Sequence, residues 1–136
     1  MTIRFKTAAL SASALCATLF CVWMFAPSHL LQLWGVSYSE SVGIVARRSG
    51  ALFAGLALML FMASDVPASM ARAGLCAGIA LSCALLAALG MFEFAEGRVA
   101  AGIGAAVVVE IAMATVFARI WRTDRALLRR AGPRRV

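Results

Sequence analysis

The chain has 136 residues, of which 63% are hydrophobic and only 14% are charged, and its net charge is +7. A soluble domain is about half apolar and a quarter charged, so this composition excludes an ordinary globular domain. Apolar runs of about 18 residues or more are typical of membrane-spanning helices, and we predict an all-α integral membrane four-helix bundle with up-down-up-down topology. The predicted spans cover residues 7–25, 42–63, 70–91 and 99–121, and a basic tail follows over residues 122–136.

The first span follows a short basic segment with Arg4 and Lys6, and it ends at Ala26 and Pro27. A charged start followed by an apolar run resembles a secretory signal, but no Ala-x-Ala cleavage site comes after it. We therefore expect a helix that remains in the membrane.

The connection over residues 28–41 separates the first and second spans. It places leucines and Trp34 beside His29, as in a short helix that lies at the membrane interface. Ser37 and Glu40 fit a capping box, in which a serine caps the helix and a glutamate three residues later bonds back to it. This pattern predicts that the second helix begins just after Ser37.

The cationic residues are concentrated on one side of the predicted bundle. Of thirteen, two lie in the N-terminus, one in the loop between the second and third spans, and seven in the C-terminal region. Cytoplasmic segments are enriched in Lys and Arg, so both termini should face the cytoplasm of a bacterial inner membrane. The C-terminal arginines attract anionic lipid headgroups, at roughly 1 kcal/mol each, which explains the basic charge without a nucleic-acid partner. They are Arg119, Arg122, Arg125, Arg129, Arg130, Arg134 and Arg135.

Glu110 is the one carboxylate inside the fourth predicted span. An ionised acid near the middle of a bilayer costs roughly 2.5–3.5 kcal/mol on insertion scales, so we expect its side chain to face protein or a wet cavity. The other residues of its every-fourth row are small, which allows another helix to approach closely. They are Gly102, Ala106, Ala114 and Ala118. The third span has a similar row, on which Ser82 falls near mid-span and can face Glu110.

Arg47 is the candidate counter-ion for Glu110. From Gly50 to Ala63 the second span has only about 21 Å of helix, which is short for a hydrocarbon core of about 30 Å. The span therefore has to include residues 42–46, and this places Arg47 below the outer surface. Arg47 shares a helix face with small residues, so we expect it to point into the bundle. Arg48, about 100° away, faces the flank or the headgroups.

Three interpretations of these residues remain open. In the first, an Arg47–Glu110 ion pair locks the second and fourth spans in register. In the second, Glu110 handles a proton or a cation, or Arg47 binds an anionic ligand. In the third, Glu110 is neutral and bonded to Ser82 or to a backbone carbonyl. Arg47 then pairs with Glu93, Glu96 or a lipid phosphate.

The remaining reactive side chains carry weaker signals. The four cysteines lie in apolar runs without a Cys-x-x-Cys pair or a nearby histidine, so we interpret them as small buried hydrophobes and expect no metal site. His29 is the only histidine. We interpret it as a solvated interfacial side chain, with a ligand role as the weaker alternative. The sequence contains no catalytic motif, phosphate loop or cofactor signature.

The segment Ala-Arg-Arg-Ser-Gly-Ala-Leu-Phe-Ala-Gly over residues 46–55 follows a first span that ends in Ala-Pro and a loop that carries Trp-Gly-Val. In these features the chain resembles a family of small bacterial inner-membrane proteins with four helices and no known function. The resemblance covers residues 7–121, with Arg47 and Gly50 at the matching positions. It implies a four-helix fold and no particular activity.

These observations favour a non-enzymatic membrane protein, either an accessory or scaffolding subunit or a binder of lipid or another hydrophobic ligand. Such a protein could act as a homo-oligomer or with a partner membrane subunit. The alternative is a small proton-coupled transporter or channel-like oligomer that uses Glu110. A membrane enzyme acting on a lipid or quinone would need Arg47, Glu110 and His29 to converge on one polar cavity.

Overall fold

The computed structural model describes residues 5–130, which contain five helices and no strand. The helices are α1 (Phe5–Phe25), α2 (Pro27–Leu33), α3 (Glu40–Ala63), α4 (Met70–Ala95) and α5 (Ile103–Arg130). All but α2 are long and apolar enough to cross a membrane. The prediction of an all-α fold with four long apolar helices is confirmed, and this is the architecture of a multi-pass membrane protein.

The helix ends match the predicted spans in part. α1 and α3 end where the sequence predicts, whereas α4 extends to Ala95, beyond the predicted range 70–91. α5 begins at Ile103 instead of residue 99 and continues to Arg130, so the first part of the predicted basic tail is helical. Other residues named in the predictions lie outside the described residues, namely Arg4, Arg134 and Arg135.

Serine side chains cap α3 and α4. Ser39 Oγ accepts a hydrogen bond from the Val42 amide (3.3 Å), and Ser69 Oγ accepts one from the Arg72 amide (3.2 Å). Each serine satisfies a backbone donor that has no partner within the first turn of its helix. The prediction that Ser37 caps the second span is wrong, because Ser39, two residues later, occupies the capping position.

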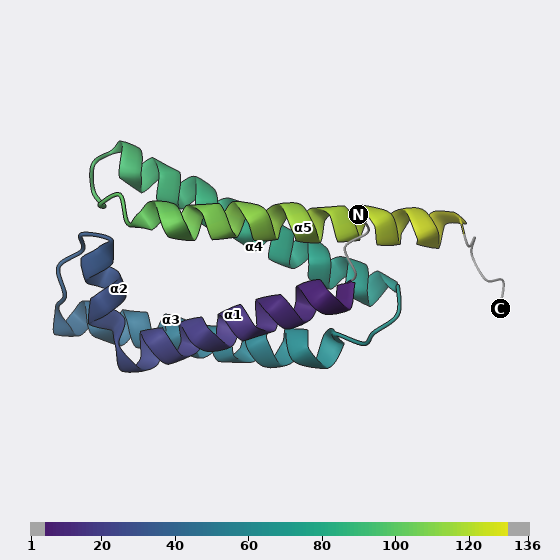
Figure 1. Ribbon diagram of the computed structural model, residues 1–136, viewed down its shortest axis with the longest axis horizontal. Coiled ribbons are helices and arrows are strands. Elements are labelled where there is room, and N and C mark those ends of the chain that lie inside the picture. Colours follow the sequence, from purple (N-terminus) through teal and green to yellow (C-terminus); the bar gives the residue numbers. More distant parts are fainter. Residues whose placement is uncertain (1–4, 131–136) are drawn as a thin grey trace.

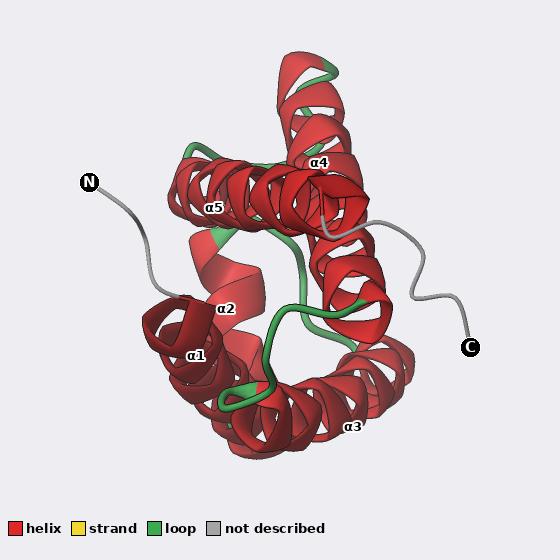
Figure 2. Cartoon of the chain, turned by 90° about the vertical axis from the view of Figure 1, so that its right-hand side faces the viewer, coloured by secondary structure: helices red, strands yellow, loops and turns green. Residues whose placement is uncertain are grey.

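The four long helices form two antiparallel pairs, α1 with α3 and α4 with α5 (Figure 1). Most contacts lie within the pairs, and the pairs meet through a smaller set of contacts between α1 and α5. Seen from one end, the pairs form two layers with α2 between them (Figure 2). Successive long helices run in alternating directions, so the beginning of α1 lies at the same end of the molecule as the last turns of α5.

The two pairs pack closely at the end where α1 begins. Small side chains such as Ala9 on α1 let the helices approach, and Leu60 of α3 and Phe117 of α5 are fully buried between them. The Ser13 hydroxyl donates to the Ala57 carbonyl oxygen over 2.7 Å, which satisfies a buried polar group between α1 and α3. The apolar core of the molecule is therefore at this end.

At the opposite end, α2 is held against the turn between α4 and α5. The Ala100 amide donates to the Trp34 carbonyl oxygen (2.7 Å), and Gly102 lies directly against the Leu33 carbonyl. Gly35, which ends this segment, has a φ of 74°, a left-handed conformation that residues with a side chain rarely adopt. These contacts place α2 between the two helix pairs.

Candidate functional site

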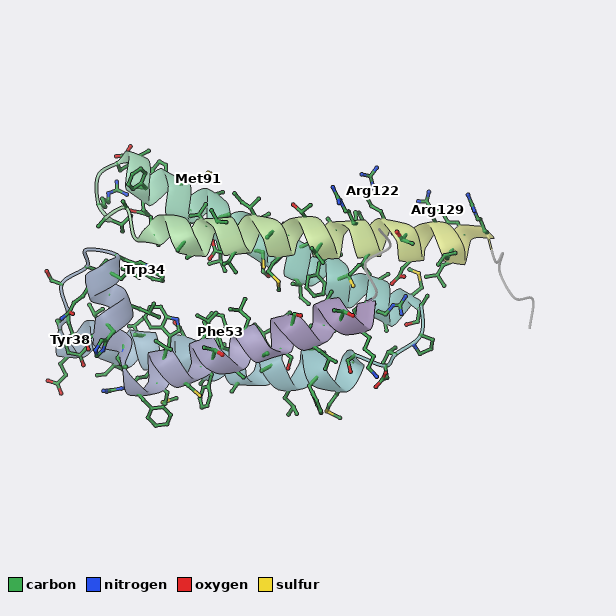
Figure 3. The ribbon with its side chains drawn as sticks, viewed as in Figure 1. Trp34, Tyr38, Phe53, Met91, Arg122 and Arg129 are labelled. Carbon is green, nitrogen blue, oxygen red and sulfur yellow. The ribbon has the colours of Figure 1, made fainter. Side chains whose placement is uncertain are left out.

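A cavity of about 890 Å³ lies between the two helix pairs. All five helices contribute to its walls, which are almost entirely apolar. Trp34 at the end of α2 and Phe53 of α3 lie between the pairs (Figure 3) and line it. Its volume falls within the range of roughly 300–1,000 Å³ that is typical of small-molecule sites.

The cavity begins where the core ends. The lining residues of this segment run from Gly102, just before α5 and beside α2, to Met113 of α5, whereas Phe117, one turn further along, is fully buried in the core. From Ala105, the first lining residue within α5, to Met113 the helix rises about 12 Å. The two pairs therefore diverge from the packed end toward the α2 end, and the cavity fills the space between them.

Glu110 supplies the only carboxylate found in the cavity wall among the described residues. It lies about 10 Å along α5 from Ile103 and within one turn of Met113, so it is near the inner end of the cavity. The ion pairs and side-chain hydrogen bonds within residues 5–130 include none to Glu110. The carboxylate thus faces the cavity and not the lipid, as expected from the cost of placing a charge in hydrocarbon. It has no protein partner within residues 5–130.

The other polar groups in the cavity wall are few and uncharged. They are the hydroxyls of Ser49 and Ser82, the thiols of Cys16 and Cys83, and the indoles of Trp23 and Trp34. Across the described part of the chain, no arginine, lysine or histidine lines this cavity. Its one formal charge is therefore negative when Glu110 is ionised.

Ser82 lines the cavity with Glu110, from the neighbouring helix α4. Gly90 of α4 lies against Val107 of α5, and this antiparallel register puts Glu110 opposite Ala87. Ser82 is then about 7 Å further along the bundle. The two predicted residues share one cavity without a hydrogen bond between them.

Arg47 does not form the predicted ion pair with Glu110. Its side chain is exposed and outside the cavity wall, and the four ion pairs within residues 5–130 involve other residues. α3 instead packs through Ala46 and through Gly50, where an added Cβ would meet Trp23 of α1. Small residues occur on more than one face of α3, so the sequence did not reveal which face packs, and the face that carries Arg47 points outward.

The weaker candidates also lie outside the cavity wall, since Arg48 and His29 are both exposed. The third interpretation pairs Arg47 with Glu93 or Glu96. In the structure these two carboxylates instead form ion pairs with Arg98, over 3.0 Å and 3.4 Å respectively. Of the predicted site residues, the structure therefore brings together only Glu110 and Ser82, which both line the cavity.

A buried ion pair between α4 and α5 is the feature that sequence reasoning missed. Arg72 Nε donates to Asp124 Oδ2 over 2.8 Å, and Arg72 Nη2 donates to Asp124 Oδ1, so the pair is bidentate. Arg72 Nη1 also donates to the Val66 carbonyl oxygen (2.8 Å), and the guanidinium lies 4.7 Å from the centre of the Phe5 ring. The pair thus connects α4, α5, the start of α1 and the loop between α3 and α4.

The sequence does carry a signal for this pair. Asp124 follows the buried Phe117 and Ile120 at helical spacing, so it continues the buried stripe of α5. A carboxylate on such a stripe needs a counter-charge, and Arg72 lies in the first turn of α4, which runs antiparallel to α5 and begins at the same end.

The cysteines are free thiols, and Cys16 and Cys76 belong to the buried core. Within residues 5–130, no group of three His, Cys, Asp or Glu side chains is placed to hold a metal ion.

Comparisons of the chain with protein-family models, with curated proteins and with solved structures find no match. The resemblance to small four-helix inner-membrane proteins stays a prediction, and the function has to be inferred from the cavity and the charges around it.

Proposed function

We propose that the protein is a multi-pass protein of the bacterial inner membrane that binds a hydrophobic ligand between the α1–α3 and α4–α5 pairs. The observation that carries this proposal is the apolar cavity of about 890 Å³ that the five helices surround. Protein interiors are close-packed, and large voids cost stability when nothing occupies them. In a membrane, the occupant that suits such walls is an apolar or amphiphilic molecule that enters from the bilayer.

Contacts at both ends of the bundle support a stable cavity. At one end, the Arg72–Asp124 pair and the buried core hold the helices together. At the other end, Gly102 and Leu33 keep α2 between the helix pairs. Closing the cavity would require the contacts at the α2 end to break, so the space is a property of the fold.

Exposed arginines on α5 support the proposed orientation, with both termini in the cytoplasm. Arg122 and Arg129 point away from the α1–α3 pair (Figure 3). Together with the exposed Arg119, Arg125 and Arg130 they form a cationic band over the last turns of α5. Such a band binds anionic headgroups at the cytoplasmic surface of the inner membrane.

A second candidate function is proton-coupled transport through Glu110. The position of its carboxylate in the cavity wall, without a partner within residues 5–130, favours this alternative. A membrane enzyme has less support, because Arg47 and His29 lie outside the wall. The test is proton-dependent flux into liposomes that contain the protein. Flux with the native protein that is lost in Glu110→Gln identifies a transporter, whereas a protein that only binds its ligand gives no flux.

A pair of matched variants tests ligand binding. Ala106 lines the cavity, whereas Ala112 on the same helix is exposed and outside the wall. Mass spectrometry of protein in lipid nanodiscs detects a retained hydrophobic molecule and the binding of tetraphenylmethane, a neutral apolar probe. We expect retention and binding by the native protein and by Ala112→Phe, and loss of both in Ala106→Phe, because the larger side chain takes up cavity space. Equal behaviour of all three proteins contradicts the proposal.

A further inference from the structure

The chemical class of the ligand is constrained by the charge in the cavity wall. Glu110 places a carboxylate there, and the lining residues of the described chain include no cation. A carboxylate in apolar surroundings either takes up a proton or acquires a positive partner, because an isolated anion is strongly disfavoured there. A ligand that carries a positive group supplies the partner that residues 5–130 do not.

The same wall disfavours anionic ligands. A phosphate inside the cavity would face Glu110 without a cationic side chain to compensate it, and like charges at close range repel. The arginines described in the structure lie elsewhere, with Arg47 and Arg48 exposed on α3 and the others outside the lining. Anionic headgroups therefore suit the cationic band of α5, whereas the cavity suits a positively charged ligand.

Two tryptophans add a second feature that suits an organic cation. Trp23 of α1 and Trp34 at the end of α2 both line the cavity, with ring centroids 5.4 Å apart and an interplanar angle of 62°. Indole faces attract positively charged groups, and indole edges pack well against apolar ones. Trp34 lies at the α2 end beside Ala100, and Glu110 is about 10 Å along α5 from its first residue, Ile103, so one ligand of roughly that length can contact both.

We propose that the cavity selects a lipophilic cation, a molecule with one amine or onium group on an aromatic or aliphatic body, and that Glu110 is its counter-ion. The inference rests on the proposed function, since it assigns a charge to the ligand of the same cavity. The positive group lies at the inner end of the cavity against Glu110. The apolar body extends toward Trp23 and Trp34.

Three probes of the same shape separate charge from hydrophobicity: tetraphenylphosphonium, which is positive, tetraphenylborate, which is negative, and tetraphenylmethane, which is neutral. Equilibrium binding is measured in nanodiscs of zwitterionic lipid. Binding to empty nanodiscs is subtracted, because the two ions partition differently into a bilayer. We expect the native protein to bind tetraphenylphosphonium roughly tenfold or more tightly than tetraphenylborate, in keeping with one favourable and one repulsive charge contact.

Two isosteric variants locate the selectivity. Glu110→Gln removes the cavity carboxylate, and Glu96→Gln removes an exposed carboxylate from the turn between α4 and α5 with the same change in net charge. We expect Glu110→Gln to lose the preference for the phosphonium while it still binds tetraphenylmethane, and Glu96→Gln to keep the preference. Glu110→Asp keeps the charge and should keep the sign of the preference, which provides a test if the glutamine variant fails to fold.

The outcomes distinguish this inference from the proposed function. Equal binding of the three probes by the native protein, or an unchanged preference in Glu110→Gln, overturns the charge selectivity and leaves hydrophobic binding in place. A native protein that binds none of the three probes overturns both.

Discussion

Arg72 and Asp124 form a bidentate ion pair between the beginning of α4 and the last turns of α5, 52 residues apart in the chain. The Asp124 side chain is 3% exposed and that of Arg72 is 14% exposed. Because little water reaches either charge, each depends on the other for compensation. The pair holds the packed end of the bundle, opposite the cavity.

Removal of one partner should be strongly destabilising. We expect Asp124→Leu to lower the free energy of unfolding by about 3–5 kcal/mol, because it leaves the Arg72 guanidinium unpaired. The double variant Asp124→Leu/Arg72→Leu should lose less stability than the sum of the losses in the two single variants. Denaturant titration in detergent micelles measures both. In the control, Lys6→Leu breaks the exposed Lys6–Asp65 pair and should cost at most about 1 kcal/mol. A similar small loss for Asp124→Leu would show that the buried pair is dispensable.

Close packing of α2 depends on a glycine. A Cβ at Gly102 would collide with the Leu33 carbonyl, which is backbone, whereas a Cβ at Gly104 meets no atom within 4 Å. We expect Gly102→Ala to destabilise the protein by about 1–3 kcal/mol and Gly104→Ala to stabilise it slightly, since alanine favours a helix over glycine by up to about 1 kcal/mol. Thermal unfolding of the two variants in detergent gives the comparison. Indistinguishable midpoints would argue against the position of α2.

Arg47 and Glu110 should contribute independently to stability. The free-energy changes of Arg47→Leu and Glu110→Leu should add in the double variant to within about 0.5 kcal/mol, as for residues without contact. Unfolding of the native protein and the three variants provides the thermodynamic cycle. A coupling of about 1 kcal/mol or more is the size found for residues in one network, and would restore the ion pair that the sequence suggests.

The α5 arginines should enrich anionic lipid around the protein. We expect the double variant Arg122→Gln/Arg129→Gln to retain less phosphatidylglycerol relative to phosphatidylethanolamine. The favourable free energy of binding anionic headgroups should fall by about 2 kcal/mol at low salt, and this difference should shrink as ionic strength rises. Lipid analysis of the purified proteins measures the ratio. Arg48→Gln/Arg98→Gln, at the other end of the bundle, is the control with equal charge change. An equal loss in the control would contradict the proposed orientation.

Features that depend on local sequence could be predicted. Four apolar runs specify four long helices, because the backbone in hydrocarbon has to satisfy its own hydrogen bonds. The position of Glu110 in the cavity wall accords with the cost of exposing a charge to lipid. The start of α3 was predicted two residues too early because Ser37 and Ser39 both suit an N-cap, and only the path of the chain selects Ser39.

The rotation of each helix about its axis could not be predicted. On α3, small residues occur on both the face with Ala46 and the face with Arg47, so the pattern does not identify the packing side. Asp124 was counted with the basic tail because the membrane span was expected to end at residue 121, and the charged sequence beyond it did not show that the buried stripe of α5 continues to Asp124. Long-range pairs such as Arg72–Asp124 depend on both the rotation and the true helix ends.

A crystal structure of the native protein grown from a lipid phase tests the binding of a hydrophobic ligand most directly. We predict electron density from a non-protein molecule between the α1–α3 and α4–α5 pairs, extending to the Glu110 carboxylate. Helix pairs that close on each other, with Glu110 turned toward acyl chains and no space between the layers, would contradict it.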